Sequence, residues 1–61
     1  MKLNVQKINL ELERLNKNWF WVAKQLGYSW NRVKYWRTSE SLRGADPIAK
    51  VLGLDPKDLI R

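Results

Sequence analysis

The side chains best suited to chemistry lie in one short stretch, WNRVKYWR, which spans residues 30–37. Its cations can bind phosphate, and its asparagine amide has the geometry to form two hydrogen bonds with the edge of adenine. Its aromatic side chains can pack on sugars or on a thymine methyl group. This mixture indicates nucleic-acid binding; the alternative is a solvated helix face beside aromatic core residues.

Enzymatic chemistry has few candidates in this chain. There is no cysteine and no histidine, which excludes disulfides and the usual zinc ligand sets. The three glycines, at positions 27, 44 and 53, form no phosphate-binding loop. Glu11 and Glu13 are two residues apart on a predicted helix, so they point to different faces. We therefore expect no enzyme, no metal and no other cofactor.

Positive charge is concentrated in the middle of the 61-residue chain, which is short enough to be a single domain. Twelve Lys and Arg against six Asp and Glu give a net charge of +6. Residues 24–43 hold one anion, Glu40, whereas residues 44–61 hold three cations and three anions. A polyanion is expected to dock on the middle region. The five cations there are Lys24, Arg32, Lys34, Arg37 and Arg43.

The N-terminal region predicts a helix rather than a targeting segment. It has no long apolar run, so no signal peptide or membrane span is predicted, and a cytoplasmic location is expected. Apolar residues at helical spacing predict a first helix that ends near Asn16, with either Asn4 or Asn9 as its cap. These apolar residues are Val5, Ile8, Leu12 and Leu15.

Two short helices are predicted next, separated by a glycine turn. Asn18 is expected to cap the first of them, and Gly27 to end it by adopting a positive φ. Ser29 then caps a helix from about Trp30 to Thr38. No strand is predicted anywhere in the chain.

The C-terminal third predicts two more helices. Residues 39–44 are expected to form a polar loop closed by Gly44. Asp46 and Asp55 each precede a proline, and this pair is typical of a helix start, with the carboxylate as cap. They predict helices over about 47–52 and 56–60.

The helix at 30–38 has a buried and an exposed side when its residues are placed 100° apart. Val33 and Trp36 fall on the side expected in the core. Arg32 and Arg37 flank this buried stripe, and Trp30 lies at its edge. The opposite side holds Asn31, Lys34, Tyr35 and Thr38.

The two helices around Gly27 can pack closely only under steric conditions that the sequence meets. Ala23 is small where the helices cross, Gly27 permits the turn, and Val33 is branched and faces the first helix. With these residues, the string from Val22 to Trp36 resembles the bacterial and phage Cro/repressor helix-turn-helix family of XRE type. IAKVLGLDPKDLI, residues 48–60, is similar to the fourth and fifth helices of that family. The resemblance covers about residues 8–60.

The resemblance implies an all-α, lambda-repressor-like bundle of about five short helices, whose third helix enters the major groove of double-stranded DNA. It implies a Cro-like transcriptional repressor, from a phage or prophage, with no cofactor. The base-reading residues would be Trp30, Asn31, Arg32, Lys34 and Tyr35. The phosphate-contacting residues would be Trp19, Arg37, Thr38 and Arg43.

Two interaction surfaces are also expected. A domain this small makes few base contacts, so a homodimer on a pseudo-palindromic operator is expected. Leu54, Leu59 and Ile60 are candidates for its contact; the alternative is that the core needs all three. Trp21 falls roughly on the side away from the core. An exposed tryptophan there suggests a contact surface; the alternative is that it folds back over the first helix and extends the small core. The alternative function is therefore a protein-interaction module, such as an antitoxin or anti-repressor, that uses the surface of residues 19–21.

Overall fold

Polar side chains begin the first three helices of the computed structural model, which describes all 61 residues. The Oδ1 atoms of Asn4 and Asn18 accept hydrogen bonds from backbone N–H groups three residues ahead, at 3.1 and 2.8 Å. Ser29 Oγ does the same at 3.3 Å. The predicted caps are thus present, and Asn4 is the N-cap of the first helix. The helices are α1 (Val5–Arg14), α2 (Trp19–Leu26) and α3 (Trp30–Ser39).

The C-terminal third differs from the prediction at Asp46. A short 3-10 helix, η1 (Leu42–Gly44), replaces part of the expected loop and runs directly into α4 (Ala45–Leu52). The backbone N–H of Ala45 bonds to the carbonyl of Leu42. Asp46 therefore lies inside the first turn of α4 and makes no capping bond, so its prediction as the N-cap was wrong.

The second Asp-Pro pair behaves as predicted. Asp55 Oδ1 accepts a hydrogen bond from the backbone N–H of Lys57 at 2.9 Å, and Pro56 begins the helix. This element is a 3-10 helix, η2 (Pro56–Leu59), one residue shorter than expected. The all-α prediction is confirmed, with four α-helices and two 3-10 helices.

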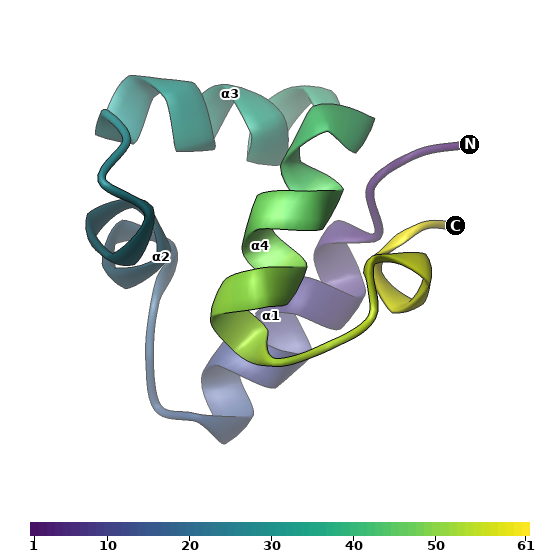
Figure 1. Ribbon diagram of the computed structural model, residues 1–61, viewed down its shortest axis with the longest axis horizontal. Coiled ribbons are helices and arrows are strands. Elements are labelled where there is room, and N and C mark those ends of the chain that lie inside the picture. The colour runs from purple at the N-terminus through teal and green to yellow at the C-terminus, as the bar shows by residue number, and fades with distance from the viewer.

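The core lies where the four α-helices and η2 meet (Figure 1). α3 runs across the top of this view, and α4 extends down from it in front of α1. α4 packs against α2, η1 and η2, so it is the central element of the fold. The buried side chains are Leu3, Ile8, Leu12, Trp19, Val22, Ala23, Val33, Trp36, Ala45, Ile48, Ala49, Leu52 and Leu59.

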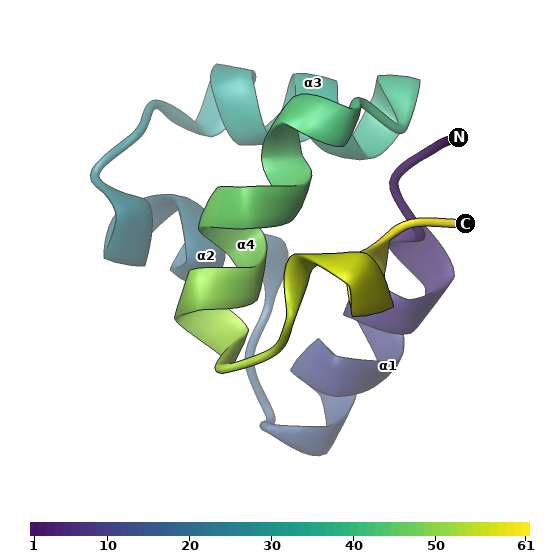
Figure 2. The same cartoon turned by 45° about the vertical axis from the view of Figure 1, so that its right-hand side comes forward.

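The two chain ends lie side by side, as Figure 2 shows from a second direction. Lys2 and Arg61 exchange two backbone hydrogen bonds, of 2.9 and 2.8 Å, and Leu3 forms an isolated antiparallel bridge with Ile60. Leu15, expected on the buried stripe of the first helix, is exposed. α1 ends before it at Arg14, and Asn16 turns the chain with a φ of 59°.

Gly27 turns the chain between α2 and α3. Its φ of 74° lies in the left-handed region, as predicted. Only three residues separate the two helices, and the Tyr28 N–H bonds back to the carbonyl of Ala23 at 3.2 Å. Ala23 and Val33 are both buried, so α2 and α3 are held against each other by the residues that the sequence indicated.

Replacing Gly44 with alanine is expected to destabilise the fold by about 1 kcal/mol. A Cβ at Gly44 would lie 3.0 Å from Trp36 Cδ2 and 3.2 Å from Trp36 Cβ, so both the ring and the backbone of α3 would have to shift. Urea unfolding measures the change. The same Gly44→Ala substitution in a Trp36→Leu background should cost less, because the crowded ring is absent. An equal cost in both backgrounds would show that the contact is not the cause.

Candidate nucleic-acid interface

The outward side of α3 is polar and exposed. Asn31, Lys34, Tyr35 and Thr38 are all exposed, and 65% of Tyr35 is accessible. Val33 and Trp36 are buried on the other side of the helix. The division of faces predicted for this helix is therefore confirmed.

The cations of the middle region have no acidic partner within the protein. The three ion pairs are Lys2–Glu40 at 3.8 Å, Arg61–Glu40 at 4.0 Å and Arg14–Glu11 at 2.8 Å. Glu40, the single anion of residues 24–43, is thus engaged by the two chain ends. The region keeps its full positive charge for an external anion. The unpaired cations are Lys24, Arg32, Lys34, Arg37 and Arg43.

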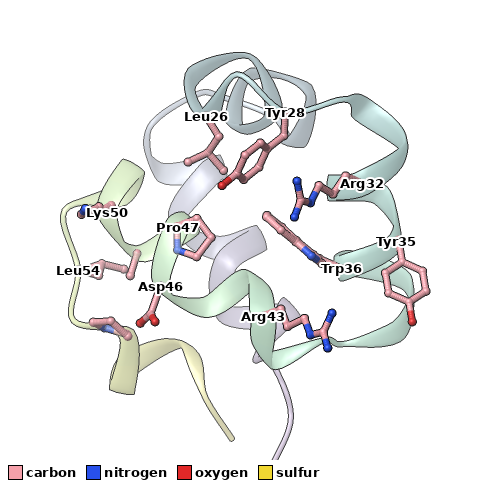
Figure 3. Close-up of a pocket in the computed structure, with 12 residues that line it drawn as sticks. Leu26, Tyr28, Arg32, Tyr35, Trp36, Arg43, Asp46, Pro47, Lys50 and Leu54 are labelled. Carbon is pink, nitrogen blue, oxygen red and sulfur yellow. The ribbon is translucent and has the colours of Figure 1, made fainter.

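Arg32 is held against two aromatic rings at the start of α3. Its guanidinium carbon lies 4.6 Å from the ring centre of Tyr28 and 5.9 Å from that of Trp36. Figure 3 shows the side chain reaching between these two rings. The guanidinium N–H groups make no hydrogen bond within the protein. The rings therefore orient a planar set of donors without consuming them.

Arg37 is held in the same way on the other flank of α3. Its guanidinium carbon lies 5.4 Å from the ring centre of Trp30 and 5.9 Å from that of Trp19. Both arginines predicted to flank the buried stripe are therefore stacked on tryptophan or tyrosine. A stacked guanidinium loses less conformational entropy when it binds a phosphate or a base edge.

Trp19 does not fit its predicted phosphate contact. It is 7% exposed, and its indole N–H donates to Asn9 Oδ1 at 2.7 Å. The residue is part of the core, and its donor is already used within the protein. Trp30 is half-buried against the ring of Phe20, with centroids 6.0 Å apart, so only part of its surface remains for a base or sugar.

The exposed aromatic residue of the NWFW run is Phe20, not Trp21. Phe20 is 60% exposed, whereas Trp21 is half-buried against the core and has the Lys17 ammonium 5.5 Å from its ring centre. Of the two placements that the sequence allowed for Trp21, the structure has the one in which the ring extends the core. Helical position leaves Trp21 at the boundary, and packing turns its large ring inward.

The predicted dimer contact is only partly available. Leu59 is fully buried in the core, and Leu54 and Ile60 are half-buried against it. The chain thus uses these residues to complete its own small core. The other large apolar residues at the surface lie elsewhere, and they include Leu10, which is 65% exposed.

Two of the remaining predicted phosphate contacts differ in what they can donate. The Thr38 hydroxyl already donates to the carbonyl of Lys34 at 2.8 Å, so it offers an external group only its acceptor side. Arg43 is exposed on η1 and has no acidic partner. Figure 3 places Arg43 at the end of a groove that also contains Arg32.

This groove, of about 960 Å³, was not predicted from the sequence. It lies beside α3 and α4, and its polar lining includes Tyr28 and Lys50, neither of which was predicted as a site residue. One signal for Tyr28 was present: it stands four residues before Arg32, a spacing that brings side chains together near a helix start. Lys50 had no such signal, because only the packing of α4 brings it to the groove.

No protein-family model, curated protein or solved structure matches the chain. No helix has both the length and the apolar character that crossing a membrane requires. No group of three or more His, Cys, Asp or Glu side chains is placed to hold a metal ion.

Proposed function

We propose that this protein is a sequence-specific double-stranded DNA-binding regulator of the helix-turn-helix type, acting as a Cro-like repressor. The observation that carries the proposal is the set of unpaired cations beside the exposed polar side of α3. Phosphates would neutralise these cations, and base edges would meet the polar side. α2 and α3, joined by three residues, form the helix pair that would place α3 in the major groove.

Five side chains of α3 have a place in this proposal. Asn31 reads adenine, and Lys34 and Tyr35 lie on the same outward side. Arg32 reaches guanine or a phosphate with donors oriented by Tyr28. Arg37 contacts the phosphate backbone from the other flank of the helix.

A second copy of the chain is expected on the operator. One domain offers a single short helix for base contacts, and dimers of such domains bind half-sites about 34–36 Å apart. Selection of binding sites from a random DNA pool tests this arrangement. A pseudo-palindrome is the expected product, and selection of no common sequence would contradict the proposal.

Asn31→Ala and Lys34→Ala are expected to affect DNA binding differently. Asn31→Ala removes a base contact and should reduce discrimination at one base pair by about 1–3 kcal/mol. If Lys34 contacts a phosphate rather than a base edge, Lys34→Ala removes a charge and should weaken binding to selected and random DNA alike. Gel shifts with both DNAs measure the two effects. If the two variants lose affinity in the same pattern, Asn31 is not a reader.

A second candidate function, a protein-interaction module, is favoured by one observation. Phe20 is 60% exposed and packs beside Trp30, which makes an aromatic surface next to α3. A protein partner would bury this surface. Phe20→Ser should then abolish partner binding, whereas it should leave the salt dependence of DNA binding unchanged.

A further inference from the structure

The groove between α3 and α4 has the size and lining of a small-molecule site. Its volume of about 960 Å³ falls within the range of ligand pockets, roughly 300–1,000 Å³. Apolar side chains from three parts of the chain line it: Leu26, Pro47, Ala49, Leu54 and Pro56. Such a surface favours a flat apolar group over a fully hydrated one.

A nearly buried donor without a partner lies in the wall of this groove. Trp36 is 5% exposed and lines the groove, yet its indole N–H makes no hydrogen bond within the protein. No fully buried side-chain nitrogen or oxygen lacks a partner, so this N–H is accessible to solvent. An indole N–H can only donate, and it therefore favours an acceptor on the occupant.

The charge of the lining specifies what kind of acceptor the occupant should carry. Arg32, Arg43 and Lys50 line the groove against a single carboxylate, Asp46, and none of these four takes part in an ion pair. Figure 3 shows Arg32 and Arg43 on the α3 side of the groove, with Asp46 on the other side of the α4 ribbon. The α3 side is thus positive and rich in donors.

We propose that this groove binds a small planar aromatic molecule that carries one carboxylate or phosphate. The anionic group binds the guanidinium of Arg32, which is free of any acidic partner, and the ring packs on the apolar lining. An inorganic anion would leave the apolar lining exposed, and a neutral ring would leave the arginines unpaired. An aryl carboxylic acid and a mononucleotide share this chemistry.

The site has a regulatory consequence that rests on the proposed function. Arg32 would serve both the occupant and DNA, so a bound molecule competes with the operator for the same guanidinium. The occupant would therefore act as an inducer that lowers DNA affinity. Binding in the groove does not itself depend on DNA, which keeps the two proposals separable.

Titration of the protein with naphthoate, followed by backbone amide NMR in the absence of DNA, tests the site. Saturable shifts are expected at residues around the groove, including those near Tyr28, Arg32 and Leu54. Naphthamide, a neutral molecule of the same shape, should bind about tenfold more weakly, because it lacks the charge-assisted hydrogen bonds. A separate titration with adenosine monophosphate distinguishes the nucleotide source from the aryl carboxylate.

Two charge-matched variants complete the experiment. Arg32→Gln should weaken naphthoate binding by about tenfold and leave naphthamide binding unchanged. Lys24→Gln removes an unpaired cation outside the groove and should change neither. The proposal is overturned if neither anion saturates, if the shifts centre on Phe20 and Leu10, or if both variants weaken naphthoate equally. The naphthoate titration contains no DNA, so it can succeed even if the protein does not bind DNA. Failure of the groove proposal can therefore be told apart from failure of the proposed function.

Discussion

Val33→Asp is expected to abolish folding at room temperature. Val33 lies on the inward side of α3 and is fully buried in the core. The core contains no buried polar or charged residue that could pair with a new carboxylate. An unpaired buried charge costs several kcal/mol, which is as much as a domain of this size has in total stability. Far-ultraviolet circular dichroism should show the loss of most helical signal.

The matched control introduces the same side chain two residues away. Asn31→Asp places a carboxylate on the exposed side of the first turn of α3, where the helix dipole favours it. This variant should remain folded. Val33→Ala should also remain folded, with a loss of about 2 kcal/mol in the free energy of unfolding. A Val33→Asp protein as stable as the Asn31→Asp protein would contradict the structure's placement of α3 on the core.

Salt is expected to have the largest effect on DNA affinity. About five phosphate contacts give a slope near −4.5 in a plot of log affinity against log salt. Raising the salt from about 50 to about 200 mM should therefore lower the affinity about 500-fold. The physical reason is that each unpaired cation releases a counterion from DNA when it binds a phosphate. Fluorescence anisotropy with a labelled random duplex measures the slope.

Two double variants of equal charge sharpen this experiment. Arg37→Gln with Arg43→Gln removes two unpaired cations and should reduce the slope to about −2.7. Arg14→Gln with Arg61→Gln removes two cations that already pair with Glu11 and Glu40, and should leave the slope near the original value. A flat salt response of the unmodified protein would favour the protein-interaction module. Equal slopes in the two double variants would show that net charge, rather than the α3 surface, binds DNA.

Much of the fold followed from signals that act within a few residues. Asn18, Ser29 and Asp55 accept the hydrogen bonds that begin their helices, and Gly27 turns the chain as expected. Such caps could be predicted because donor and acceptor are close in sequence. Asp46 shows the limit of the same reasoning: η1 joined directly to α4 and left its carboxylate in the first turn instead of at the cap.

The sequence predicted which residues of the candidate site are exposed, but it did not predict which side chains contact each other. Helical periodicity placed Asn31, Lys34 and Tyr35 outward, and all three are exposed. The same periodicity could not show that Trp19 donates to Asn9, ten residues earlier. It also could not decide whether Trp21 extends the core, and the structure shows that Trp21 packs against the core while Phe20 is exposed.

The sequence by itself thus determined where α2, α3 and η2 begin, the turn at Gly27 and the side of α3 that carries polar groups. These features depend on backbone hydrogen bonds and on a period of 3.6 residues, which are local properties. Only the tertiary structure decided which rings hold Arg32 and Arg37, which tryptophan N–H is bonded within the protein, and where the groove lies. Those features depend on how large side chains from separate helices pack together in one small core. Such packing joins residues that are far apart in the sequence, so local patterns do not predict it.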